Sequence, residues 1–326
     1  MKRGRIYLQY GFWEAVKKID KSVFGPDAWE LFEVMRASNV QAEIPLEDFG
    51  HDDFMSMLWH ETGGSCYIEK GEIEKVLSEN NPSIEDLCSV FLLNMDELEC
   101  EKYSQRRGLL CFNADMLSHK KYLINEKNIS YEFHQVGDYY CLRDFFTQPC
   151  NSLIMIDPHI LNESSNINKH LRHLLNNILP ESLDMPFDIS IFSGIGKNNF
   201  DDKELVQSFY TKIQEMLQKI RPNLIFSFSL YQIPAQGEGW HDRYVLTNTL
   251  MIEATGGFDV FGRDRESGNF IARKDCKFHI YQPILNKNAD DYFQWIKKTS
   301  LESKKEERYQ HRRFGTENNR LFQLEQ

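Results

Sequence analysis

The stretch Gly239-Trp240-His241-Asp242-Arg243-Tyr244-Val245-Leu246-Thr247-Asn248 indicates the fold of this chain more specifically than any other part of it. From Arg243 onward its alternate residues suit the two faces of a β-strand, so we expect a strand here. Because side chains two apart on a strand point to the same side, His241 and Arg243 would project together, as a phosphate clamp requires. Asn248 has the opposite parity and would join them only across a bend or bulge.

His241, Arg243 and Asn248 fit the frame H-x-K-x-x-x-x-D, with Arg in the Lys position and Asn in the Asp position. The pair Gly256-Gly257 follows where that frame carries small residues, and Gly257-Phe258-Asp259-Val260-Phe261 continues it. In these motifs the chain resembles the phospholipase D superfamily. Within that superfamily it is similar to the C-terminal domain of MIT-domain-containing proteins and their bacterial relatives. The resemblance covers about residues 150–285 and implies a dimeric phosphodiesterase fold adapted to phosphate groups.

The same resemblance implies roles for individual residues. In the parent chemistry a His forms a phosphohistidine, a Lys neutralises the phosphate, and an Asp stabilises the charged His. His241, Arg243 and Asn248 are therefore the candidate catalytic residues, and Arg243, Gly256 and Gly257 the candidate phosphate-binding residues. Arg243 keeps the charge and adds a fork that suits two phosphate oxygens. Asn248 cannot support an imidazolium as a carboxylate does, and the comparable change in a Ser-His-Asp triad lowers turnover about 10⁴-fold. The parent route needs no metal, and we expect no metal or other cofactor.

Two functions follow, and the sequence leaves both open. The first is a binding or sensing module that recognises a phosphate-bearing ligand, such as a nucleic acid or nucleotide, with His241 and Arg243. The second is an active, metal-independent phosphodiesterase or nuclease with His241 as its nucleophile. A variant phosphodiesterase domain beside an unfamiliar partner domain is also the usual design of prokaryotic conflict proteins, including antiphage effectors. That analogy favours a role in defence and a protein partner encoded in the same operon.

Composition bounds these hypotheses. The 326 residues allow two domains of ordinary size, and 41% hydrophobic and 27% charged residues are typical of a soluble globular protein. No run of residues approaches the roughly 18 apolar residues of a membrane span, and no signal peptide is evident, so we expect a cytoplasmic protein. The seven cysteines lack metal-ligand spacing and are expected to be reduced thiols in the core.

The charge pattern and the order of elements divide the chain. Residues 1–149 are predicted to form a separate acidic α/β domain, because residues 1–150 carry nearly all of the net charge of -11. Residues 150–296 alternate strands and amphipathic helices in the order β-α-β-α-β-β, which predicts an α/β domain with a mixed sheet flanked by helices. Residues 297–326 are expected to be a mixed-charge helix or tail, and the alternative is a basic arm over the His241 cleft.

The first domain raises a second possible site. Its acidic residues invite a metal-nuclease interpretation, because carboxylates are the ligands that Mg²⁺ prefers. A surface on an acidic domain explains them without any metal, and we favour that explanation. The residues concerned are Asp52, Asp53, Glu61, Asp96 and Asp115.

The parent chemistry uses two His motifs, one as nucleophile and one as general acid, and we interpret the stretch around His241 as one of them. A single-motif chain would complete its site by pairing His241 with its copy across a two-fold axis. We therefore expect a homodimer whose axis passes near residues 239–248, with Trp240 close to the contact.

Overall fold

The computed structural model describes most of the chain in eleven segments and four single positions. These are residues 5–12, 39–43, 66–79, 83–118, 127–146, 148–195, 202–233, 243–283, 289–304, 313–316 and 319–325, and positions 15, 35, 56 and 60. The fold is α/β, with mixed and parallel sheets flanked by helices. No helix among these residues is long and apolar enough to cross a membrane.

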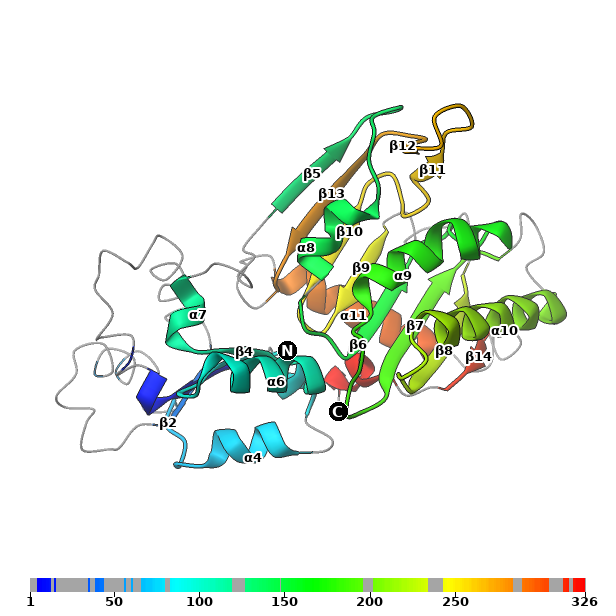
Figure 1. The fold of residues 1–326 in the computed structure, drawn as a ribbon. Helices are drawn as coiled ribbons and strands as arrows, with labels where there is room; N and C mark the ends of the chain where they lie inside the picture. Colours follow the sequence, from blue (N-terminus) through cyan, green and yellow to red (C-terminus); the bar gives the residue numbers. More distant parts are fainter. Residues whose placement is uncertain are drawn as a thin grey trace.

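The first part of the chain forms a four-stranded sheet in the order β2-β1-β3-β4, in which every neighbouring pair is parallel (Figure 1). Its strands are β1 (Ile6–Gln9), β2 (Val40–Glu43), β3 (Val90–Leu92) and β4 (Leu110–Phe112). The helices around it are α4 (Glu72–Ser78), α5 (Ile84–Leu87), α6 (Glu97–Arg107) and α7 (Ala114–Ser118).

Local sequence explains most of these boundaries. The side chain of Asp96 accepts a hydrogen bond from the Glu99 amide and begins α6, and Gly108 follows its last residue. The strand β3 begins only at Val90, because Ser83 accepts a hydrogen bond from the Asp86 amide and starts the helical turn α5 just before it.

The second part of the chain forms an eight-stranded mixed sheet in the order β14-β8-β7-β6-β9-β10-β13-β5. The strands β6, β7 and β8 are parallel, and all other neighbours in this sheet are antiparallel. Its strands are β5 (Lys127–Tyr131), β6 (Ser152–Ile156), β7 (Phe187–Ser193), β8 (Phe226–Gln232), β9 (Tyr244–Thr247), β10 (Met251–Ala254), β13 (Cys276–Tyr281) and β14 (Arg313–Gly315). A separate hairpin joins β11 (Phe261–Arg263) to β12 (Phe270–Ala272).

Helices cover this sheet on two faces (Figure 1). One core packs alternate residues of β6 and β7 against α9 and α10, and another packs the remaining residues of β6 against α11. The helical elements of this second part of the chain are η2 (Tyr139–Leu142), α8 (Arg143–Phe146), the π-helical turn η3 (Ile167–Leu171), α9 (Arg172–Ile178), α10 (Lys203–Ile220), α11 (Ala289–Ser303) and η4 (Arg320–Glu325). The order of strands and helices expected for residues 150–296 is observed from β6 to β9, and the helix between β6 and β7 begins as η3.

The two sheets share one of these cores. Buried residues of β1, β3 and β4 form a continuous apolar cluster with Ile154 and Ile156 of β6 and with Tyr292 of α11. The Tyr292 hydroxyl donates a 2.5 Å hydrogen bond to the Thr247 carbonyl and lies 3.7 Å from the Cys88 sulfur. The acidic first part is therefore packed closely against the second.

The larger sheet also extends beyond the expected limits of residues 150–296. β5, from the expected first domain, pairs with β13 at one edge of the sheet, and β14, from the expected tail, pairs with β8 at the other. The helix α11 runs across position 296 without a break. Pairing between strands that lie more than 80 residues apart leaves no local signal, which is why the sequence pattern missed both edges.

Candidate functional site

Arg243 lies at the edge of the large sheet where the parallel strands end. It immediately precedes β9, which runs antiparallel to β6 with Tyr244 opposite Ile156. Arg243 therefore sits beside Asp157, the first residue after β6. The carboxyl ends of parallel strands are where α/β proteins gather their binding sites.

Asp157 is fully buried and organises this edge. Its Oδ1 accepts hydrogen bonds from the amides of His159 and Ile160, at 2.8 and 3.1 Å, and its Oδ2 accepts one from the Phe258 amide at 2.8 Å. Burial raises the pKa of this carboxyl, while the backbone donors and Arg243 act in the opposite direction. Asp157 thus joins the loop after β6 to the loop after β10.

Within the described residues, the guanidinium of Arg243 is held by one hydrogen bond and one longer ion pair. Nη1 donates to the Thr255 carbonyl at 3.1 Å, and Nε lies 4.0 Å from Oδ1 of Asp157. Nε is buried and makes no hydrogen bond within the described residues. The side chain remains 20% exposed, so its tip reaches the surface.

The pair Gly256-Gly257 forms the turn against which Arg243 packs. Gly257 has a φ of 90°, and a Cβ atom there would lie 2.8 Å from Cδ of Arg243 and 3.0 Å from Oδ1 of Asp259. A Cβ on Gly256 would lie 2.5 Å from the Asp275 carbonyl oxygen. Any side chain at either position would therefore push this turn away from its neighbours.

Three further titratable residues lie around the turn. Asp259 forms an ion pair with Lys274, so the charges of Arg243, Lys274, Asp157 and Asp259 balance. His170, on η3, is 8% exposed, and its Nδ1 is buried without a hydrogen-bond partner among the described residues. Burial lowers the pKa of His170 to about 4, so its imidazole is neutral at pH 7.

Asn248 lies at the opposite end of β9 from Arg243, near the start of β6. Its Nδ2 donates to the carbonyls of Leu87 and Gly108, both at 2.9 Å, and its Oδ1 accepts from the Asn151 amide at 2.9 Å. The side chain is buried and fastens the two sheets together. The structure therefore brings Arg243, Gly256 and Gly257 together and keeps Asn248 apart from them, because β9 runs straight between them.

The remaining predicted positions divide into two groups. His241 and Trp240 lie outside the described residues, as do Asp52, Asp53 and Glu61. Of the acidic residues described, Asp96 caps α6 and Asp115 lies in the first turn of α7. Within the described part of the chain, no group of three or more His, Cys, Asp or Glu residues could hold a metal ion. The seven cysteines form no disulfide, and six of them are buried.

Sequence reasoning missed the residues that build this edge. Asp157 has one local signal, since it directly follows a fully buried strand. Asp259 belongs to the stretch Gly257-Phe258-Asp259-Val260-Phe261, whereas Lys274 lies 15 residues after Asp259 and His170 comes from η3, in a distant segment of the chain. No model of a known protein family matches the chain, and no curated protein matches it significantly.

Proposed function

We propose that this chain is a phospholipase D-like protein that binds a phosphate-bearing ligand, a nucleic acid or a nucleotide, with Arg243 and His241. The observation that carries the proposal is the position of Arg243: its guanidinium reaches the surface at the carboxyl edge of three parallel strands, over the Gly256-Gly257 turn. The N–H groups that its contacts with Thr255 and Asp157 leave over can donate to phosphate oxygens.

Binding rather than catalysis is the function that this geometry favours. The parent reaction needs an acid that stabilises the charged His, and Asn248 is a neutral amide whose polar atoms contact the backbone of Leu87, Gly108 and Asn151. Phosphodiester cleavage through His241, completion of the site by a second copy of the chain, and a role in antiphage defence remain predictions.

The test is binding of a fluorescently labelled oligonucleotide, single- or double-stranded, at low ionic strength. Arg243→Lys should bind about as well as the parent, whereas Arg243→Ala should bind at least tenfold more weakly, because charged hydrogen bonds contribute about 1.5–3 kcal/mol. Arg265→Ala, at an exposed position in the β11–β12 hairpin, is the matched control and should leave binding unchanged. Equal binding by Arg243→Ala and the parent would contradict the proposal that Arg243 binds the phosphate group.

A pair of glycine variants tests the turn itself. Gly257→Ala and Gly268→Ala both place a side chain at positive φ, but only Gly257 has Arg243 within reach of the new Cβ. We expect Gly257→Ala to weaken oligonucleotide binding by displacing Arg243, and Gly268→Ala to leave it intact. Loss of binding in both variants would point to general misfolding instead of the clamp.

A further inference from the structure

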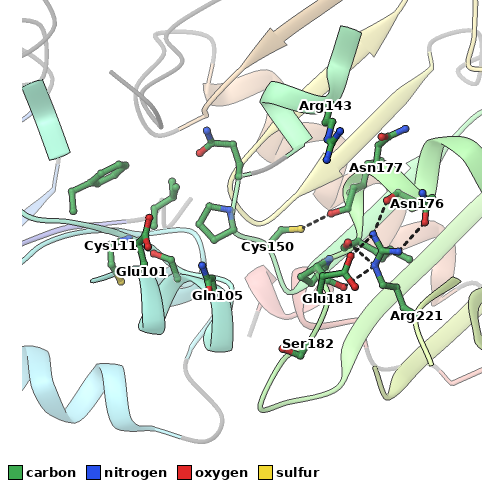
Figure 2. Close-up of a pocket in the computed structure, with 18 of the residues that line it drawn as sticks. Glu101, Gln105, Cys111, Arg143, Cys150, Asn176, Asn177, Glu181, Ser182 and Arg221 are labelled. Carbon is green, nitrogen blue, oxygen red and sulfur yellow. Dashed lines mark hydrogen bonds and ion pairs between the residues drawn. The ribbon is translucent and has the colours of Figure 1, made fainter. Parts of the chain in front are cut away.

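A pocket that does not include Arg243 lies between the part of the chain with the four-stranded sheet and the part with the eight-stranded sheet (Figure 2). Its volume is about 670 Å³, within the range of about 300–1,000 Å³ typical of small-molecule sites. One wall is α6 with the edge strand β4, and the other is the carboxyl end of α9 with residues 179–182. The connection at Pro149 and Cys150 crosses between the walls.

The second wall is fixed before any ligand arrives. Arg221 donates from Nε to the carbonyls of Leu179 and Pro180, both at 3.1 Å, and from Nη1 and Nη2 to Asn176 at 2.8 and 2.7 Å. Nη1 also donates to the Ile220 carbonyl at 2.9 Å, and the guanidinium forms an ion pair with Glu181 at 3.3 Å. Arg221 is therefore committed to structure, and its charge is neutralised (Figure 2).

The connection is fixed as well. The Cys150 thiol points toward the Ile178 carbonyl at 3.7 Å, and Asn248, next to this connection, bonds to both the Gly108 carbonyl and the Asn151 amide. A pocket whose walls are tied together in this way costs a ligand little reorganisation.

Two polar groups in the pocket have no partner. Arg143, at the start of α8, is exposed and makes no hydrogen bond or ion pair within the described residues. Gln148 is 4% exposed, and its Oε1 accepts a hydrogen bond from Gln282, but its Nε2 is buried without a hydrogen-bond partner in the described part of the chain. A buried amide N–H without an acceptor lowers the stability of the fold, and an acceptor atom on a ligand would remove that cost by accepting its hydrogen bond.

The chemistry of the ligand follows from these groups. One free guanidinium suits one anionic group, and amide side chains suit the hydrogen-bonding edge of a heterocycle. Apolar side chains, among them Leu110, Phe112 and Met116, supply surface for the flat ring. We propose that this pocket binds a nucleoside monophosphate, with its phosphate on Arg143 and its base among the amides. The ligand would contact β4 and α6 on one side and the end of α9 on the other, so it would also stabilise the packing between the two parts of the chain.

The experiment is isothermal titration of the full chain with the four common nucleoside 5′-monophosphates, the corresponding nucleosides and inorganic phosphate. At least one monophosphate should bind at a site that Arg243→Ala preserves, more tightly than its nucleoside and than phosphate. Arg143→Gln should weaken that binding at least tenfold, while Arg106→Gln, an exposed arginine outside the pocket, should not.

A second pair of variants tests whether a large side chain in the pocket prevents binding. Gln105 and Lys102 are both exposed on α6, and only Gln105 lines the pocket. Gln105→Trp should abolish binding, and Lys102→Trp should preserve it. Arg243→Ala should leave monophosphate binding intact, which separates this site from the one under Proposed function. The inference is overturned if no monophosphate binds at millimolar concentration, or if Arg143→Gln and Gln105→Trp both bind as the parent does.

Discussion

The side-chain amide of Asn248 joins three backbone groups that come from three separate segments of the chain. Two of these groups are carbonyls, which require the N–H donors of an amide. The residue type is therefore explained by packing between the sheets, without any contribution to catalysis. An aspartate here would match the superfamily frame better, but it would place a carboxylate against the carbonyls of Leu87 and Gly108.

That conflict gives a prediction for Asn248→Asp. Because the buried carboxylate would lose both donors and face two carbonyl oxygens, the free energy of unfolding should fall by about 3 kcal/mol or more. Asn248→Ala should also destabilise the protein, and Asn168→Asp, at an exposed position, should change stability little. Chemical denaturation measures all three. A stable Asn248→Asp variant that gains metal-independent phosphodiesterase activity would contradict this explanation and would support a catalytic role for position 248.

Elements with complete local signals are those that the sequence predicts well. For α6, acidic residues in the first turn, Arg106 and Arg107 in the last turn, the cap at Asp96 and the following glycine all agree. The candidate site is predictable only in part, because Arg243 and the Gly256-Gly257 pair belong to one continuous motif. Asp157 and His170 come to that motif through the register of β6 and the packing of η3, which no short stretch of sequence encodes.

The turn η3 gives a pH prediction, since it buries His170 as a neutral imidazole. Burial lowers the pKa of His170 to about 4; Asp259 opposes this shift, and Lys169, Lys274 and His173 add to it. In the unfolded chain the pKa is about 6.5. Below pH 6.5 the imidazole of His170 binds a proton in the unfolded state but stays neutral in the folded state. The free energy of unfolding therefore falls as the pH drops from about 6.5 toward 4. The loss attributable to His170 approaches about 3 kcal/mol.

Denaturation at several pH values, compared between the parent and His170→Gln, isolates this effect. Burial raises the pKa of Asp188 to about 6, so Asp188 contributes in the opposite direction over the same pH range, equally in both proteins. The parent should lose stability relative to His170→Gln as the pH falls, and an exposed control, His134→Asn, should follow the parent. Parallel pH profiles for the parent and His170→Gln would mean that His170 is solvated.

At the scale of the whole molecule, the shared core predicts that both sheets unfold together. Leu92 of β3 is fully buried in the core that joins the sheets, and Ile189 of β7 is fully buried in the core under α9 and α10. Replacing either residue with Ala removes buried apolar contacts and should cost about 2–5 kcal/mol. If the sheets are one cooperative unit, each variant should lower the midpoint of the same single calorimetric transition, even though the two residues belong to different sheets. Two independent domains would behave otherwise: Leu92→Ala would lower one transition and leave a second, higher transition at its original temperature.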